Sequence, residues 1–239
     1  MKVLAACEFS GVVRDAFAAL GHEAWSCDLL PTDAPGNHHE GDVLDILDRG
    51  WDLIIAFPPC TYLCSSGMHW TTRGLRDPQL TENALAFVRA LFAAPCSRIA
   101  LENPVGAISS RIRKPDQIIH PWQFGHAESK TTCLWLKNLP LLVPTGLIQK
   151  PAGGRWENQT VSGQNRLGPS PNRWRERSKT YPGIARAMAS QWSASALCSP
   201  ANSPVQGMRR TLVPCSHGTL FNLRLRRTRQ RGGAWMDTD

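Results

Sequence analysis

The residues best suited to chemistry lie in two short strings, Phe57-Pro58-Pro59-Cys60 and Glu102-Asn103-Pro104. A thiolate is a strong nucleophile, and a carboxyl group can protonate an electron-poor ring as the sulfur adds to it. Each string directly follows an apolar run that is typical of a buried strand, at residues 52–56 and 98–101. The carboxyl ends of parallel strands meet at one edge of a sheet, where ligands bind. We therefore expect the thiol and the carboxyl group to face one crevice.

Cys60 is the candidate nucleophile. Pro58 and Pro59 stiffen the chain before it and fix the direction of its thiol. The alternative is an inert buried cysteine, which the position just after two prolines at a strand end argues against. Cys64 forms a CxxxC spacing with Cys60, but no second Cys or His pair at suitable spacing completes a metal site. We therefore expect no bound metal.

Glu102 is the candidate acid. That role requires a carboxyl pKa raised by partial burial. Asn103 would brace the loop, and Pro104 would hold Glu102 in its turn. The alternative is a structural carboxylate that caps a helix, although such a carboxylate would not explain a partnership with Cys60.

Apolar strand patterns alternate with helical patterns along residues 2–150, and this alternation predicts an α/β sandwich with a largely parallel, twisted sheet. Gly, Pro, Asn, Ser and Arg dominate residues 150–180, which we interpret as a loop that orders on binding or as a reduced insertion. We expect strands at residues 2–6, 23–27, 52–56, 98–101 and 132–136, and helices at 13–20, 82–94 (with Thr81 as N-cap) and 184–192.

Five motifs occur in the order of a known family. They are Phe9-Ser10-Gly11 after the first strand, Asp28 after the second, Gly41-Asp42-Val43, Pro58-Pro59-Cys60 and Glu102-Asn103-Pro104. In this order they resemble the motifs of the cytosine-5 DNA methyltransferases, especially compact members encoded by bacteriophages and prophages. The resemblance covers roughly residues 3–192. It implies a Rossmann-like S-adenosylmethionine-dependent methyltransferase sandwich with a mostly parallel twisted sheet.

The resemblance also implies a reaction, the transfer of a methyl group from S-adenosylmethionine to carbon 5 of cytosine in DNA. Cys60 would add to carbon 6 of the ring, while Glu102 contacts ring nitrogen 3 and the exocyclic amine. The family has a paired-arginine motif before a later strand, and here Lys130 stands in the corresponding stretch. The expected catalytic set is Cys60, Glu102, Pro59, Asn103 and Lys130.

The cofactor site implied by the resemblance lies at the first three strand ends. Gly11 would let the backbone approach a nucleoside, and Phe9 would offer a face to the adenine. Asp28 would accept hydrogen bonds from ribose hydroxyls, and Asp42 would contact the adenine amino group. The alternatives are a tight turn with Phe9 in the core, a solvated carboxylate at Asp28 and a turn-forming Asp42. The expected set is Phe9, Ser10, Gly11, Asp28, Asp42, Val43 and Pro58.

The recognition region is short in this chain. We divide the chain into a catalytic domain at residues 1–143, a reduced recognition region at 144–178, a returning helix at 179–195 and a flexible, disordered basic tail at 196–239. Family members carry a longer recognition region, and Val12-Val13-Arg14 replaces the glycines they have after Gly11. The cations suited to phosphate contact in nucleic acid are Arg166, Arg173, Arg175, Arg177 and Lys179.

Composition limits the class of protein. The net charge is +8, but seven Arg and two acidic residues in the last 44 positions supply five of these charges. A basic balance favours polyanion partners such as DNA. No apolar stretch is long enough for a membrane span, and eight Cys do not form a disulfide scaffold. We expect a cytoplasmic monomer without a membrane partner, in a phage or restriction-modification setting.

Two other functions stay open. The first is modification of RNA, single-stranded nucleic acid or a nucleotide pyrimidine by the same chemistry. The short recognition region leaves this substrate open. A catalytically inactive nucleic-acid-binding relative would keep the fold, although it has no need of the Pro-Cys and Glu-Asn strings.

Overall fold

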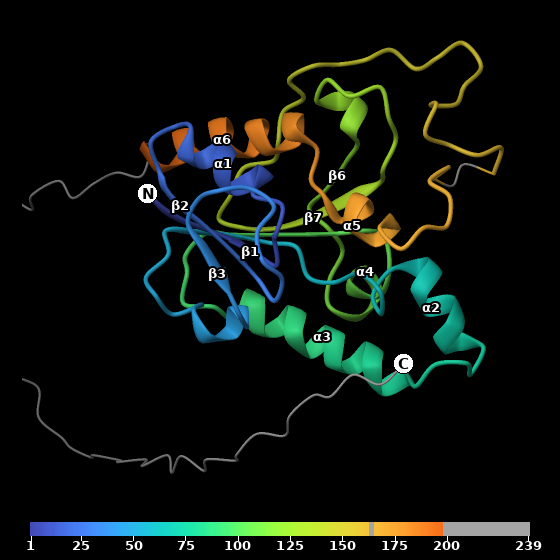
Figure 1. Cartoon of the computed structure of the whole chain (residues 1–239), viewed down its shortest axis with the longest axis horizontal. Coiled ribbons are helices and arrows are strands. Elements are labelled where there is room, and N and C mark those ends of the chain that lie inside the picture. Colours follow the sequence, from blue (N-terminus) through green and yellow to red (C-terminus); the bar gives the residue numbers. More distant parts are fainter. Residues whose placement is uncertain (163–164, 198–239) are drawn as a thin grey trace, which may run out of the picture. The chain divides into compact units, whose positions relative to one another are not determined.

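A mixed seven-stranded sheet forms the centre of the structure, in the order β3-β2-β1-β4-β5-β7-β6 (Figure 1). The computed structural model describes residues 1–162 and 165–197 of the chain. Strands β1 to β5 pair in parallel, whereas β7 runs antiparallel to both β5 and β6. The strands are β1 Lys2–Ala6, β2 Glu23–Asp28, β3 His38–Glu40, β4 Leu53–Ala56, β5 Ile99–Asn103, β6 Gln117–Ile119 and β7 Thr132–Lys137.

The strand order reverses between β1 and β4. From β1 the chain moves outward to β2 and β3, and then it returns to β4 on the other side of β1. In such doubly wound sheets, ligands bind beyond the carboxyl ends of the strands at this switch point. Ala6 pairs with Ala56, and Ala56 pairs with Leu101. The segments after β1 and β4 and the last residues of β5 therefore meet at one edge.

Helices cover both faces of the sheet, and alternate residues of each strand face opposite layers. Val3 and Ala5 pack with α1 (Val12–Ala18) and α6 (Pro182–Leu197), whereas Leu4 and Ala6 pack with α3 (Pro78–Phe92). Figure 1 shows α1 and α6 on one side and α3 on the other. The remaining helices are η1 Val43–Asp45, α2 Ser65–Thr72, α4 Ala107–Arg111, η2 Pro121–Gln123 and α5 Arg173–Ser178.

The expected α/β sandwich with a mostly parallel sheet is confirmed, but some boundaries were wrong. Helix α3 begins at Pro78, and Asp77 is its N-cap, with Oδ1 accepting from the N–H of Gln79 over 2.8 Å. Asp followed by Pro is a stronger start signal than Thr81, which is buried inside the helix. Strand β3 was missed because His38–Glu40 is polar, and it is an edge strand.

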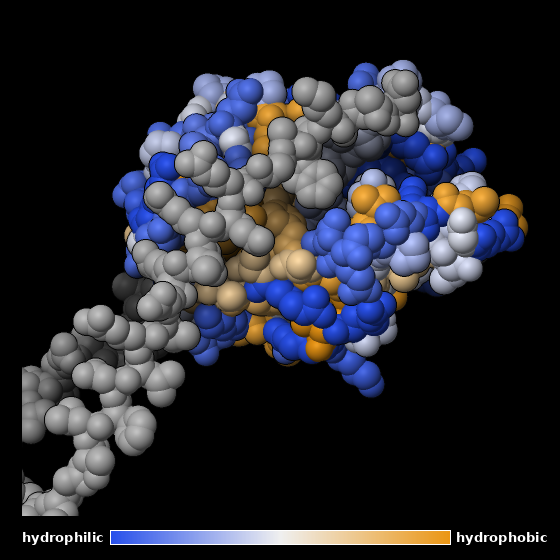
Figure 2. All heavy atoms as spheres, turned by 90° about the horizontal axis from the view of Figure 1, so that it is seen from below, coloured by the Kyte–Doolittle hydropathy of each residue, from blue (hydrophilic) through white to orange (hydrophobic). Residues whose placement is uncertain are grey.

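The surface and the chain ends add little to the architecture. Figure 2 views the molecule from the α3 side and shows polar residues over much of that face, with apolar residues gathered near its middle. No helix in the described ranges is long and apolar enough to cross a membrane. The tail expected at 196–239 lies outside the described residues, apart from the last turn of α6.

Candidate active site

Cys60 and Glu102 lie at the ends of neighbouring strands. Cys60 comes four residues after the end of β4, and Glu102 is the fourth residue of β5. Cys60 is exposed and Glu102 is half-buried. The charge of Glu102 acts on the Cys60 thiol and contributes to raising its pKa. The structure therefore brings the predicted nucleophile and the predicted acid to one edge of the sheet.

Asn103 joins the two strings directly. Its side-chain amide donates a 2.7 Å hydrogen bond to the carbonyl oxygen of Pro58, and the residue is only 1 % exposed. Burial makes such a bond costly to lose, because the carbonyl would be left without a partner. The expected bracing role of Asn103 therefore has a specific contact, and it fixes the chain just before Cys60.

Backbone hydrogen bonds also join the loop that follows Cys60 to the loop that follows Pro104. Ala107 N donates to the carbonyl of Leu63 over 2.7 Å, and Ser65 N donates to that of Val105 over 3.0 Å. Gly106 lies at this contact, where a Cβ atom would come within 1.9 Å of the Leu63 oxygen. Only glycine allows the loops to approach this closely.

Burial raises the pKa of Glu102, whereas the charge of Lys130 and a hydrogen bond from Thr132 lower it. Burial is the largest of these effects, so the net shift is upward, as the proton-donor role requires. Lys130 lies close to Glu102, and its position is stabilised by a hydrogen bond in which Nζ donates to the carbonyl oxygen of Arg177 over 3.1 Å. Lys130 thereby links the acid to α5.

Cys64 is a site residue that sequence reasoning discounted. It is the residue before α2, and the interaction of its thiol with that of Cys60 is the largest influence on the pKa of both. The Ser66 hydroxyl lies 3.3 Å from its Sγ. Together with an N–H of Gly67, these contacts lower the pKa of Cys64, whereas the same pairing and the charge of Glu102 raise that of Cys60. The signal was present as a CxxxC spacing just before a helix start.

The predicted cofactor residues gather at the ends of β1, β2 and β3. Gly41 N donates to the carbonyl of Asp28 over 2.9 Å, which brings Asp42 close to Asp28. Burial raises the pKa of Asp28, and Asp42 Oδ1 accepts from the N–H of Leu44 over 3.0 Å as the cap of η1. Asp42 therefore has the turn role expected as its alternative and also lies at this edge of the sheet. Val43 is buried in the core.

Two leucines at this edge were not singled out from the sequence. Leu29, directly after Asp28, is 74 % exposed, and Leu44, two residues after Asp42, is 44 % exposed. Each places apolar surface beside a carboxylate, which suits a flat ring with polar edges. A leucine after an acidic strand end is too common a pattern to have indicated this.

Arg14 packs against the turn after β1 and binds the loop after β2. Gly11 has a φ of 76°, and a Cβ there would come within 2.5 Å of Arg14 Nη2. The buried guanidinium donates to Ser26, Thr32 and the carbonyls of Ala34 and Pro35. These hydrogen bonds hold the loop after β2 against the start of α1.

Glu8 and Ser10 support the start of α1. Ser10 Oγ donates to Glu8 Oε1 over 2.7 Å, and the N–H of Val13 donates to the same oxygen over 3.1 Å. Glu8 is buried, and burial raises its pKa. Ser10 therefore acts within the turn, whereas Gly11 supplies its backbone conformation.

Helix α5 covers Phe9. The Arg175 guanidinium lies 4.9 Å from the centre of the Phe9 ring, and the Trp174 ring lies 5.9 Å from it. Asp33 holds the helix there through ion pairs with Arg175 and, at 2.9 Å, with Lys179. Phe9 is thus only 5 % exposed, and Leu29 and Leu44 are the more accessible apolar side chains.

The cations predicted to contact phosphate occupy different settings. Arg175 and Lys179 are paired with Asp33, as described above. Arg177 is exposed and its charge reaches both Cys60 and Cys64. Arg166 is exposed and donates to the carbonyl of Glu157 over 3.3 Å. Arg173 is half-buried. Three of these cations, at 173, 175 and 177, are thereby carried by one short helix beside the site.

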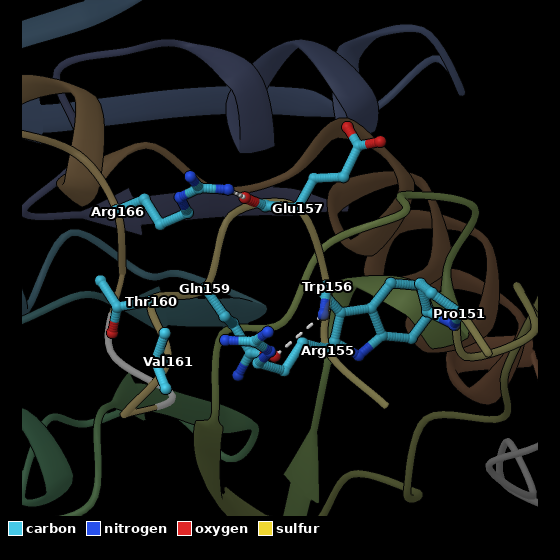
Figure 3. Close-up of a pocket in the computed structure, with 8 residues that line it drawn as sticks. All are labelled: Pro151, Arg155, Trp156, Glu157, Gln159, Thr160, Val161 and Arg166. Carbon is cyan, nitrogen blue, oxygen red and sulfur yellow. Dashed lines mark hydrogen bonds between the residues drawn. The ribbon is translucent and has the colours of Figure 1, made fainter. Parts of the chain in front are cut away.

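One cavity lies elsewhere, lined by residues between 151 and 161 and by Arg166. It has a volume of about 580 Å³ and is lined by Arg155, Trp156, Glu157 and Arg166 among others. Figure 3 shows Trp156 at one side and Arg166 and Glu157 above it. None of its lining residues comes from the strand ends that carry Cys60 and Glu102. The cavity belongs to the expected recognition region.

Comparison with models of known protein families and with curated proteins found no match to this chain. In the described part of the chain, no group of three His, Cys, Asp or Glu residues is placed to hold a metal ion. All six described cysteines are free thiols, of which Cys27 and Cys133 are buried and Cys7 is half-buried. The chemistry of the site is therefore argued from its own geometry.

Proposed function

We propose that this chain transfers a methyl group from S-adenosylmethionine to carbon 5 of cytosine in DNA. The observation that carries the proposal is the contact between Asn103 and Pro58, because it ties the thiol string and the carboxyl string into one unit. The strand reversal between β1 and β4 supports a nucleoside-type ligand at the same edge. The Rossmann-like methyltransferase sandwich is part of this proposal.

Cys60 and Glu102 divide the chemistry. The Cys60 sulfur adds to carbon 6, while Glu102 in its protonated form gives a proton or a hydrogen bond to ring nitrogen 3. The raised pKa of Glu102 favours that form. The addition makes carbon 5 nucleophilic, and elimination after loss of the carbon 5 proton frees Cys60. Pro59 and Asn103 hold the loop, and Lys130 tunes Glu102.

The residues at the first three strand ends fit S-adenosylmethionine. Asp28 and Asp42 supply acceptors for ribose hydroxyls and an adenine amino group, and Leu29 and Leu44 supply exposed apolar surface for the ring. When bound, the cofactor supplies a methyl group on a positively charged sulfur. Gly11 allows close approach of the backbone. Contact with Phe9 requires α5 to move from its present position.

DNA is the proposed substrate because cations surround the site. A base inside a duplex must leave the stack to reach Cys60, and exposed Arg177 lies beside that thiol. Each phosphate contact removed should lower the slope of log affinity against log salt by about 1. Arg166→Ala and Arg177→Ala test this in full-chain protein, with Arg186→Ala, at an exposed position of α6, as the matched control.

The decisive experiment measures label transfer from isotopically labelled cofactor to duplex DNA, together with trapping of the enzyme on 5-fluorocytosine DNA. Wild type should transfer label and form a covalent adduct, whereas Cys60→Ser should do neither. Label transfer that survives Cys60→Ser unchanged would falsify the mechanism. Transfer to RNA or free nucleotides but not to duplex DNA would favour the related pyrimidine-modifying function, and binding without any adduct would favour an inactive relative.

A further inference from the structure

A second reactive feature of the site is the pair of thiols on one helical turn. The N–H of Cys64 donates to the carbonyl of Cys60 over 2.9 Å, which closes the turn. Side chains four residues apart on a helical turn have Cβ atoms about 5–6 Å apart, whereas a disulfide needs about 3.5–4.5 Å. The turn must therefore tighten before the two sulfur atoms can bond. The interaction between the two thiols is the largest influence on the pKa of each.

The surroundings of the pair distinguish it from the other described cysteines. Cys60 is the exposed thiol of the six, Cys64 and Cys7 are half-buried, and Cys27, Cys96 and Cys133 are buried. Cys64 precedes the eight-residue helix α2 and faces the Ser66 hydroxyl at 3.3 Å and the charge of Arg177. Accessible thiolates beside a second cysteine are the ones that peroxides oxidise reversibly.

We propose that Cys60 and Cys64 form an oxidative modification site, at which a hydroperoxide converts the two thiols into an intramolecular disulfide. The disulfide removes the nucleophile of the proposed methyl transfer. The consequence for activity rests on the proposed function, but formation of the disulfide does not.

The chemistry proceeds in two steps. The Cys64 thiolate attacks one oxygen of hydrogen peroxide, the O–O bond breaks, and the departing hydroxide takes up a proton to become water. Cys64 is then a sulfenic acid. The Cys60 sulfur attacks the Cys64 sulfur, the S–S bond forms, and the hydroxyl leaves with the Cys60 proton as a second water. The thiols lose two electrons to the peroxide, and a dithiol reductant reverses the change.

The test uses full-chain reduced protein treated with hydrogen peroxide, alkylated and digested with trypsin. The tryptic peptide 50–73 contains Cys60 and Cys64 and no other cysteine. After peroxide it should resist alkylation and weigh two hydrogens less than the reduced peptide. Dithiothreitol should restore double alkylation.

Two variants control the result. Cys64→Ser should give no such peptide, and oxidation of its Cys60 should stop at the sulfenic acid because no second thiol is left to displace the hydroxyl. Cys96→Ser, at a buried cysteine outside the pair, should still form the lighter peptide. Peptide 50–73 that stays doubly alkylated while other cysteines oxidise would overturn the proposal. Methyl transfer is measured on the same samples before peroxide is added. A protein that forms the disulfide but shows no methyl transfer contradicts only the proposed function and supports the oxidation site.

Discussion

The side-chain amide of Asn103, at the end of β5, donates a 2.7 Å hydrogen bond to the carbonyl oxygen of Pro58, beyond the end of β4. Asn103→Ala removes the donor and leaves a buried carbonyl unpaired. We expect a loss of about 1–3 kcal/mol in the free energy of unfolding, together with a marked loss of label transfer. Denaturant melts and transfer assays measure both.

The matched control is Asn138→Gly. Asn138 also donates a 2.7 Å bond, to the carbonyl of Ser97, and its φ of 52° suits glycine. This bond lies at the opposite edge of the sheet, so transfer should be retained. Equal losses of transfer in both variants at equal stability would mean that Asn103 has no special relation to the site.

Gly106 allows the two loops to touch, and this predicts a steric effect of a single methyl group. Gly106→Ala would bring a Cβ to 1.9 Å from the Leu63 oxygen, so the loops must separate. We expect lower stability and less adduct on 5-fluorocytosine DNA. Gly153→Ala, where no atom lies within 4 Å, should change neither. A Gly106→Ala variant with normal trapping would show that the loop contact is dispensable.

Burial raises the pKa of Glu102, so its folded-state pKa lies above its unfolded value. The ionised carboxylate therefore destabilises the fold above the folded pKa, and this cost is absent below the unfolded pKa. Glu102→Gln should raise the melting temperature at neutral pH, but not in strong acid, while it abolishes transfer. Melts across pH check the sign, and a variant less stable at neutral pH contradicts it.

Lys130 lowers the pKa of Glu102, and this makes a prediction for the pH profile. If the protonated acid is the active form, transfer declines as pH rises through that pKa. Lys130→Gln removes the charge but keeps a donor for Arg177, so the decline should shift to higher pH. Lys137→Gln, at the far end of β7, is the control. An unshifted single-turnover profile would remove Lys130 from the tuning role.

Asp33 holds α5 over Phe9 through Arg175 and Lys179. Asp33→Asn should weaken this hold and expose the ring more often. Because apparent affinity scales with the binding-competent fraction, the cofactor dissociation constant should fall. Calorimetry measures it, and Asp116→Asn, which breaks the Arg113 pair at 2.8 Å, is the control. Weaker cofactor binding in Asp33→Asn but not in Asp116→Asn would contradict this prediction. It would mean that α5 in its present position contributes to the cofactor site and does not block it.

Much of the fold follows from local pattern. The apolar runs at residues 2–6, 53–56 and 99–101 became central strands, because only buried parallel strands suit such continuous hydrophobicity. The polar His38–Glu40 strand could not be predicted, since an edge strand needs little apolar surface and is decided by its neighbour β2. The start of α3 was misplaced because two capping signals compete within five residues.

The candidate site divides in the same way. Cys60 and Glu102 could be proposed from residue type and position after a strand, because parallel strands end at a common edge. The sequence by itself thus determined which chemical groups lie at that edge. Only the tertiary structure decided that Asn103 reaches Pro58, that Cys64 touches Cys60 and that α5 covers Phe9. These contacts join residues whose distance along the chain, or whose side-chain direction on a turn, leaves no periodic trace, so packing alone selects them.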